Sequence, residues 1–216
     1  MNTASANNNN QKDEEHLINN NQTLQSYENS AFQYAASVSK DPSQHIKEAI
    51  LQMVEIAGKG GTILEVGSGP GWDADFVESL GVTVRRTDAT AAFRDFQLKR
   101  GKKIDPLNIL TDEFGGPYNG IMALYVLQHI DRNQVAQVLN KVAEALQPNG
   151  TFLVCILEGE NEFWQQGDVS GNYHVVFWNE ADFINALKTA GLEVIWETRH
   201  VDSEGPWMNF LAQKKS

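Results

Sequence analysis

Three glycines within five residues, Gly67, Gly69 and Gly71, follow the apolar run at 63–66. Such a cluster predicts a sharp backbone turn that lets a ligand approach closely. The dinucleotide-binding pattern G-x-G-x-x-G would need its third glycine at Trp72, where an indole stands instead. The turn therefore predicts a small-ligand site and argues against a bound diphosphate.

Two carboxylates flank this turn in the sequence. Glu65 ends the apolar run two residues before the first glycine, where it would repel phosphate and attract an ammonium group. Asp88 ends the next apolar run, at about the spacing that places an acidic side chain on a ribose diol. The ligand is thus expected to carry a cationic end and a sugar.

Further polar side chains follow the third and fourth apolar runs of the sequence. After the third run, Asp105 or Asn108, with the backbone N–H of Ile109, could read the edge of a purine. After the fourth run come Leu124, Tyr125 and His129. His129 or Tyr125 could act as a general base, and packing is the alternative for the histidine.

Apolar runs alternate with amphipathic segments along the rest of the chain. Runs at 63–66, 82–87, 118–124 and 151–157 have the character of buried strands, whereas segments at 72–80, 90–100, 131–146 and 179–190 have helical spacing. Late strands are expected in LEVIWETR and WMNFLAQK, and 158–178 is expected to be a long loop that covers the acceptor pocket. The alternation predicts an α/β fold, a doubly wound Rossmann-like sandwich with a mostly parallel sheet and an antiparallel last strand.

The Asn-rich N-terminal segment is expected to be a separate part of the chain. Residues 1–22 contain NNNN and NNN runs that predict a disordered tail, and residues 23–216 a single domain that opens with two lid helices. Tyr27 and Tyr34 lie at helical spacing on the first of these helices, either as lid aromatics or as a plain core stripe. A tethering role for the tail is a further alternative, which deletion of residues 1–22 would test.

Composition narrows the class of protein. The 216 residues carry 28 acidic against 17 basic side chains, a net charge of −11, which argues against a nucleic-acid partner. The one cysteine, Cys155, lies in an apolar run, as expected for a reducing compartment. Neither a membrane span nor a secretory signal is visible, so a cytoplasmic protein is expected.

These motifs together resemble the class I S-adenosylmethionine-dependent methyltransferases of the small-molecule type. The similarity covers about residues 23–214 and rests on E-V-G-S-G-P-G at 65–71, T-D-A-T at 87–90, P-L-N-I-L at 106–110, Y-N-G-I-M-A-L-Y-V-L-Q-H-I at 118–130, L-Q-P-N-G-T-F at 146–152 and A-G-L-E-V at 190–194. The glycine motif joined to an acidic residue after the second strand is a fairly specific pair.

The resemblance implies S-adenosylmethionine as cofactor and a role for each matching residue. Gly67, Ser68 and Gly69 would pass under its amino acid moiety, Glu65 would lie near its ammonium, and Asp88 would accept hydrogen bonds from the ribose. Ala89, Asn108 and Ile109 would lie at the adenine, and Leu124 would also contact the cofactor. Tyr27 and Tyr34 would close over the methionine end. Asn108 stands where the family usually has aspartate, and it is favoured over Asp105 by its distance from the following strand.

The implied reaction transfers a methyl group to an oxygen or nitrogen of a small organic acceptor. Methyl displacement from a sulfonium needs no acid, so positioning of the reactants is the main requirement. No metal is expected, because the fourth-strand segment lacks clustered carboxylates. The alternatives are a non-catalytic module that binds S-adenosylmethionine or S-adenosylhomocysteine, and an NAD-dependent oxidoreductase, which Trp72 disfavours.

Overall fold

The computed structural model describes residues 4–167, 169 and 171–215, with side chains from residue 18 onward. In chain order the elements are α1 (Ala4–Ser37), α2 (Gln44–Ala57), β1 (Thr62–Val66), α3 (Trp72–Ser79), β2 (Thr83–Asp88), α4 (Ala91–Lys99), β3 (Asp105–Pro106), β4 (Tyr118–Ala123), the 3₁₀ turns η1 (Leu127–His129) and η2 (Arg132–Gln134), α5 (Val135–Ala145), β5 (Leu146–Glu158), β6 (Glu162–Gly167), β7 (Gly171–Trp178), α6 (Glu180–Thr189), β8 (Leu192–Val201) and β9 (Pro206–Lys214).

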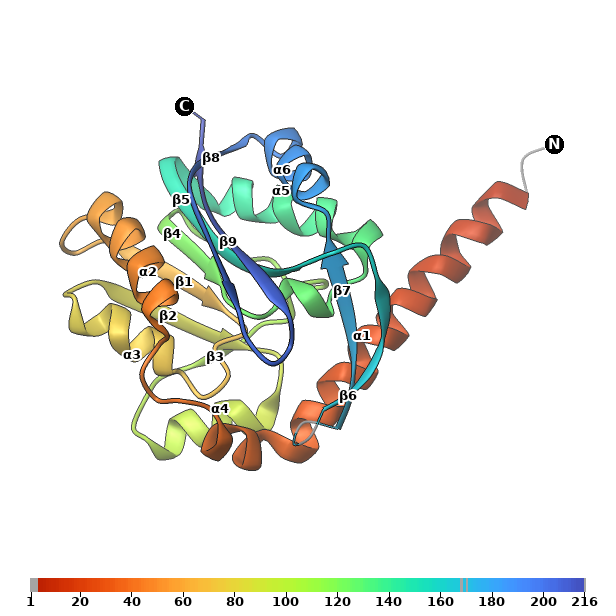
Figure 1. Ribbon diagram of the computed structural model, residues 1–216, viewed down its shortest axis with the longest axis horizontal. Coiled ribbons are helices and arrows are strands. Elements are labelled where there is room, and N and C mark those ends of the chain that lie inside the picture. The colour runs from red at the N-terminus through yellow and green to blue at the C-terminus, as the bar shows by residue number, and fades with distance from the viewer. Residues whose placement is uncertain (1–3, 168, 170, 216) are drawn as a thin grey trace.

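The strands form one sheet, as expected from the alternation of apolar runs and helices (Figure 1). Strands β3, β2, β1, β4 and β5 are parallel neighbours in that order. Strand β5 pairs with β4 along one edge and, antiparallel, with the last strand β9 along the other edge. Strand β8 pairs antiparallel with β9. The predicted doubly wound α/β sandwich with an antiparallel last strand is confirmed.

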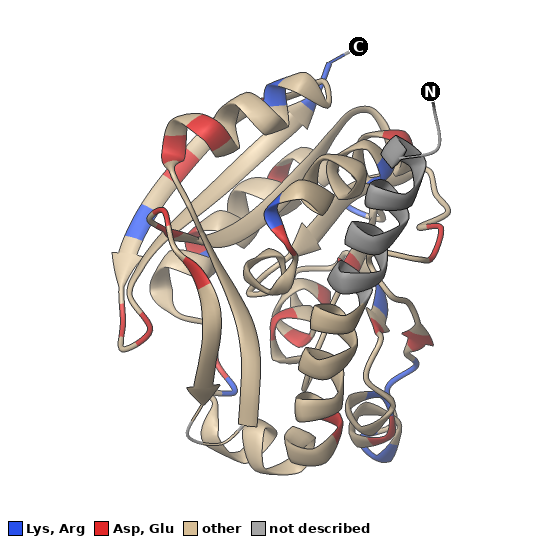
Figure 2. Ribbon diagram, turned by 90° about the vertical axis from the view of Figure 1, so that its right-hand side faces the viewer, with Lys and Arg blue, Asp and Glu red and all other residues tan. Residues whose placement is uncertain are grey.

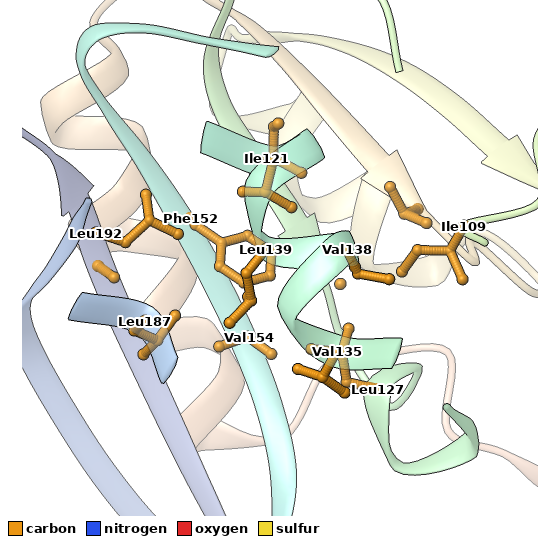
Figure 3. Close-up of a cluster of buried hydrophobic side chains, with 14 of the residues drawn as sticks. Ile109, Ile121, Leu127, Val135, Val138, Leu139, Phe152, Val154, Leu187 and Leu192 are labelled. Carbon is orange, nitrogen blue, oxygen red and sulfur yellow. The ribbon is translucent and has the colours of Figure 1, made fainter. Parts of the chain in front are cut away.

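Two apolar layers hold helices against the sheet. On one face, α5 and α6 bury side chains such as Leu139 and Leu187 against Phe152 and Val154 of β5 (Figure 3). On the other face, Ile50 of α2 belongs to a second cluster together with residues of α3 and β1. Strand β5 contributes side chains to both clusters, so both of its faces are buried, and its continuous apolar sequence suits that position.

The segment 158–178 is a β-hairpin rather than the expected loop. Strands β6 and β7 pair from Glu162↔Val176 to Gly167↔Gly171, and the end of β7 joins the tip of β5 in parallel at Leu157↔Phe177. The β-branched and aromatic run Val175–Trp178 favours strand over loop. The hairpin lies beside α1, so these segments distant in sequence together form one side of the molecule (Figure 1).

Helix α1 starts long before the boundary expected at residue 22. It runs from Ala4, and Asn19 and Asn20, both assigned to the tail, contact the body of the protein. Asn19 donates to the carboxylate of Asp131 at 3.2 Å, and Asn20 accepts from Asn108 at 3.1 Å. Polar residues can join a fold through such hydrogen bonds without burying apolar surface. Residues 1–3 of the expected tail lie outside the described residues.

The spacing of Asp131 and Gln134 resembles a capping box, but Asp131 does not cap the 3₁₀ turn that follows it. Its side chain makes no cap hydrogen bond to η2, and lies 2.9 Å from Nδ1 of His174 on β7. A buried carboxylate gains more from a potentially charged partner than from one backbone amide.

No described helix combines the length and apolar composition that crossing a bilayer requires. On the side of the ribbon drawn in Figure 2, the Lys and Arg segments are scattered among acidic ones rather than gathered in a continuous stripe.

Candidate active site at the carboxyl ends of the strands

A cavity of about 470 Å³ opens where β1, β2 and β4 end, beneath α1 and the loop between β8 and β9. This volume is typical of sites for cofactors and small ligands. All the expected site residues except Glu65 line it: Tyr27, Tyr34, Gly67, Ser68, Gly69, Asp88, Ala89, Asn108, Ile109, Leu124, Tyr125 and His129. The fold thus brings together residues from five separate segments.

The glycine turn passes along the cavity in a conformation that requires glycine. Gly67 has a φ of +66°, and a Cβ there would meet Val126 Cγ2 at 2.5 Å. Gly69 has a φ of +52°, but a Cβ there would point into open space, with no described atom within 4 Å. Gly69 therefore leaves room for a ligand, whereas Gly67 lets the chain pack.

Arg86 holds this turn from beneath, a role that the sequence interpretation missed. Its side chain, on β2, is almost fully buried, and its Nη1 donates to the carbonyl of Gly71 at 2.9 Å. Its Nη2 lies 2.7 Å from Asp75 and 2.8 Å from Glu78, both on α3. The spacing of these two acids, three apart on one helix face, was a signal for a buried basic partner.

Glu65 does not face the cavity, contrary to the expectation that it would attract the ligand's ammonium. Its buried carboxylate is hydrogen-bonded by the Ser68 hydroxyl, inside the turn. Burial raises the pKa of Glu65 to about 8, so the group is mostly protonated at pH 7. A protonated carboxyl behind the turn offers no counter-charge to a cation.

Asp73 is the carboxylate that lines the cavity beside the glycine turn. It lies in the first turn of α3, and burial raises its pKa to about 6. It is thus mostly ionised at pH 7. Its place directly after the glycines was the signal that could have identified it, since helix N-termini favour acidic residues.

The raised pKa of Glu65 predicts a measurable dependence of stability on pH. The folded protein holds this proton more tightly than the unfolded chain, whose ordinary value is 4.5. The stabilisation is therefore complete below about 4.5 and is lost as the pH rises through about 8. We expect Glu65→Gln to remove that loss, so that the free energy of unfolding of the variant falls less between pH 5 and pH 8 in denaturant titrations. Identical pH slopes for the two proteins would contradict the assignment.

Asp88 is oriented by two backbone amides. Its Oδ2 accepts from the N–H of Gly69 at 2.7 Å and its Oδ1 from the N–H of Thr90 at 2.8 Å. The side chain is buried, and burial raises its pKa. Each oxygen keeps a second lone pair for a ligand hydroxyl. The carboxylate can therefore serve the local turn and a sugar diol together.

Of the two candidates for the purine edge, Asn108 reaches the cavity. Asp105 is absent from the lining and forms an ion pair with Arg85 at 3.0 Å. The Asn108 amide is held at both ends, since its Oδ1 accepts from the N–H of Leu110 at 2.9 Å and its Nδ2 donates to Asn20. The adjacent backbone of Ile109 is thereby held at the cavity wall.

His129 forms a hydrogen-bonded pair with Tyr27. Its Nδ1 lies 2.7 Å from the backbone carbonyl of His174, which can only accept, so Nδ1 carries the hydrogen. Its Nε2 then has a lone pair and accepts from the Tyr27 hydroxyl at 3.0 Å. Burial lowers the pKa of His129 to about 4, which keeps the ring neutral. Tyr34 packs edge-on to Tyr27 at 5.6 Å between ring centroids, so both expected lid aromatics face the cavity.

Tyr125 is poorly suited to the role of base. It adopts a left-handed backbone with a φ of 59°, and its ring packs edge-on against Trp207 at 5.0 Å. Burial raises the pKa of its hydroxyl far above the ordinary value, which disfavours the phenolate that a base requires. Its strained backbone instead turns the ring into the cavity.

One group of described residues outside the cavity has donor atoms close enough to hold a metal ion. These are Asp131, Glu162 and His174, whose ligand atoms lie within 4.8 Å of one another. The contact of 2.9 Å between Asp131 and Nδ1 of His174 also accounts for the cluster, as a link between the hairpin and the start of η2. None of the three lines the cavity.

Comparison with known proteins agrees with this architecture. The most similar solved structures include a 1,6-didemethyltoxoflavin N1-methyltransferase of Burkholderia thailandensis, with its acceptor and S-adenosylhomocysteine bound (15% identity, TM-score 0.63, covering 80% of this chain and 79% of that one). They also include a methyltransferase of Methanosarcina mazei (13%, 0.68, 81% and 99%) and a magnesium protoporphyrin IX methyltransferase of Synechocystis with S-adenosylmethionine bound (13%, 0.65, 80% and 79%). At these identities the likeness shows the fold.

A search of curated protein sequences found no match. The sequence model of a methyltransferase domain family, in contrast, matches residues 38–197, which is most of the chain and includes β1 to β7 with the glycine turn. The expected enzyme class is confirmed: the chain belongs to the methyltransferase domain family.

Proposed function

We propose that the protein transfers a methyl group from S-adenosylmethionine to an oxygen or nitrogen atom of a small organic acceptor. The observation that carries this proposal is the joint placement of Asp88 and the glycine turn on one cavity. Two structural neighbours bind this donor or its product. Their acceptors, a toxoflavin precursor and a porphyrin, are small organic molecules.

The cavity suits the donor in each of its parts. Asp88 would accept from the ribose hydroxyls, and the backbone of Ala89 and Ile109 would flank the adenine. The open space over Gly69 would take the amino acid portion. Asp73, rather than Glu65, would face the ammonium group, since it is the ionised carboxylate at that end of the cavity.

The chain's own residues would act mainly by orientation. The bound donor supplies a methyl group on a positively charged sulfur, which leaves without help from an acid. Tyr27 and Tyr34 would cover the reacting groups and exclude water, which holds acceptor and methyl in near-attack geometry. His129, neutral with its lone pair on Nε2, could take a proton from a hydroxyl acceptor through Tyr27.

The direct experiment is incubation of the full chain with S-adenosylmethionine and a panel of small amines, phenols and carboxylic acids. Mass spectrometry would detect methylated product, and S-adenosylhomocysteine release would be measured separately. Methylation of at least one acceptor class is expected. Tight donor binding with no product from any acceptor would support the non-catalytic binding module instead.

The glycine turn offers a test of the donor site with a closely matched control. Gly69→Ala would place a methyl group in the space proposed for the donor, and Gly81→Ala would place one in open space at a turn far from the cavity lining. Both positions have positive φ, so both variants should lose about 1–2 kcal/mol of stability. We expect only Gly69→Ala to weaken S-adenosylhomocysteine binding, by about 10-fold or more, which corresponds to ~1.4 kcal/mol. Equal affinities in calorimetry would rule out this placement of the donor.

A further inference from the structure

We propose that a small pocket behind the main cavity binds the nitrogen of an amine acceptor, which makes the protein an N-methyltransferase of small amines. This inference rests on the proposed function. The inner pocket has a volume of about 50 Å³, enough for an amino group but not for a ring system. The residues that carry the argument are Tyr27, Tyr34, Tyr125, Gln128, His129 and Glu204, all in its lining.

The inner pocket is a neighbour of the main cavity, in which the methyl group would be presented. Five of these residues, all but Gln128, line the main cavity as well, so the two spaces share one wall. An acceptor could therefore keep its carbon skeleton in the main cavity while its nitrogen reaches inward. The two lid tyrosines would then lie against the nitrogen.

Gln128 supplies an unsatisfied hydrogen-bond acceptor. Its side chain is only 4% exposed, and its Oε1 has no hydrogen-bond partner among the described residues. A buried amide oxygen without a hydrogen-bond partner lowers the stability of a protein by about 1–3 kcal/mol. An N–H group bound in this pocket could donate to the oxygen and recover that free energy. The neighbouring His129 Nε2 already accepts from Tyr27 and cannot supply the missing hydrogen.

The charges around both spaces favour a cation. Among the described residues that line them there is no lysine or arginine, whereas the carboxylates are Asp41, Asp73, Asp88, Asp202 and Glu204. Tyrosine rings add faces that attract ammonium groups. A carboxylate or phosphate acceptor would meet only repulsion here. The pocket thus favours a positively charged group that carries several N–H hydrogen-bond donors.

Glu204 provides a route for the proton that an ammonium group must lose. It lies in the loop between β8 and β9, lines both spaces and is exposed to solvent on its outer side. The carboxylate would take one proton from R–NH₃⁺ and pass it to water. The nitrogen lone pair then forms the C–N bond as the bond from methyl carbon to sulfur breaks, its electron pair going to sulfur. The products are R–NH₂⁺–CH₃ and the neutral thioether.

The test compares three ligands with one carbon skeleton: benzylamine, benzyl alcohol and benzoate. Each is titrated calorimetrically into the full chain saturated with S-adenosylhomocysteine, after the affinity for that product has been measured alone. Benzylamine should bind at least about 10-fold more tightly than either analogue. Benzyl alcohol lacks the positive charge, and benzoate lacks both the positive charge and the hydrogen-bond donors. With S-adenosylmethionine, mass spectrometry should find N-methylbenzylamine.

Two variants test the residues themselves. Gln128→Leu removes the free amide oxygen, and Glu204→Gln removes the outer charge. Each should weaken benzylamine binding about 10-fold (~1.4 kcal/mol) while leaving the affinity for S-adenosylhomocysteine within about twofold. Glu193→Gln, an exposed glutamate on β8 outside both linings, is the control and should change neither. Because Glu204 is exposed, its variant is expected to fold even if Gln128→Leu does not.

The outcomes separate this inference from the proposed function. Alcohol or benzoate binding as tight as that of the amine, the absence of amine binding, or an unchanged affinity in Glu204→Gln would overturn the amine pocket while leaving the donor site intact. Failure of S-adenosylhomocysteine itself to bind would remove the proposed function instead.

Discussion

Replacement of Asp88 by alanine is expected to weaken the binding of S-adenosylmethionine and S-adenosylhomocysteine by about 100-fold or more, and replacement by asparagine by about 10-fold or more. Two ribose hydroxyls would donate to this carboxylate, and a hydrogen bond to a charged group is worth about 1.5–3 kcal/mol. Loss of both would cost ~3 kcal/mol at least, which is roughly two powers of ten in affinity. Asparagine keeps the size of the side chain and one accepting oxygen, so its effect should be the smaller of the two.

Calorimetric titration with S-adenosylhomocysteine measures this effect, and thermal unfolding shows whether the variant is folded. The second check is needed because Asp88 also accepts from the amides of Gly69 and Thr90. Asp105→Asn is the matched control, since Asp105 ends the neighbouring strand but lies outside the cavity lining. If Asp88→Asn bound the product as tightly as Asp105→Asn, Asp88 would have no part in the site.

Arg86→Met is expected to lower the free energy of unfolding by about 1.5–3 kcal/mol, the usual contribution of hydrogen bonds to charged groups, since Asp75 and Glu78 keep Lys102 as a partner. The variant loses the contacts to Asp75 and Glu78, and the Gly71 carbonyl keeps the N–H of Asp75 but loses the second donor that Arg86 supplies. Because that carbonyl belongs to the glycine turn, donor binding should weaken together with stability. Chemical denaturation and calorimetry on the same preparation would measure both effects.

Arg199→Met serves as the comparison. Arg199 also contacts glutamates, but it is 42% exposed, and exposed ion pairs contribute about 0–1 kcal/mol. We expect this variant to lose no more than that and to bind donor normally. Comparable stability losses in the two variants would mean that the burial of Arg86 does not matter.

The mostly parallel sheet with helices on both faces could be predicted because apolar runs and amphipathic helices alternate along the chain. Strand β5 illustrates this, since Phe152 and Val154 lie in a continuous apolar run that only a strand buried on both faces explains. Asp88 and the glycines could be predicted as site residues for a related reason. The carboxyl ends of parallel strands meet at one edge, so spacing along the chain becomes proximity in space.

Side-chain direction and long-range pairing could not be predicted in the same way. Glu65 and Asp73 lie at nearly the same place in the sequence, but only the second lines the cavity, because the first is enclosed by the turn and bonded by Ser68. Spacing cannot distinguish these two outcomes. Asn20 looked like part of a tail because its partner, Asn108, is 88 positions away.

The role proposed for Gln128 was likewise hidden from the sequence. A glutamine in a 3₁₀ turn has no distinctive pattern, and only the folded structure shows that its amide oxygen is buried with no hydrogen-bond partner among the described residues. The hairpin β6–β7 contributes to this enclosure through Tyr173, which also lines the inner pocket. Segments with weak sequence signals thus shape the proposed acceptor pocket, whereas the strong motifs lie at the proposed donor site.

A crystal structure of the full chain with S-adenosylhomocysteine bound would test the central claim most directly. We expect the ligand's ribose hydroxyls within hydrogen-bonding distance of both Asp88 oxygens, its amino acid portion over Gly69, and its sulfur facing the lid tyrosines. A ligand bound elsewhere on the protein, or one that lies in this cavity without touching Asp88, would contradict the account.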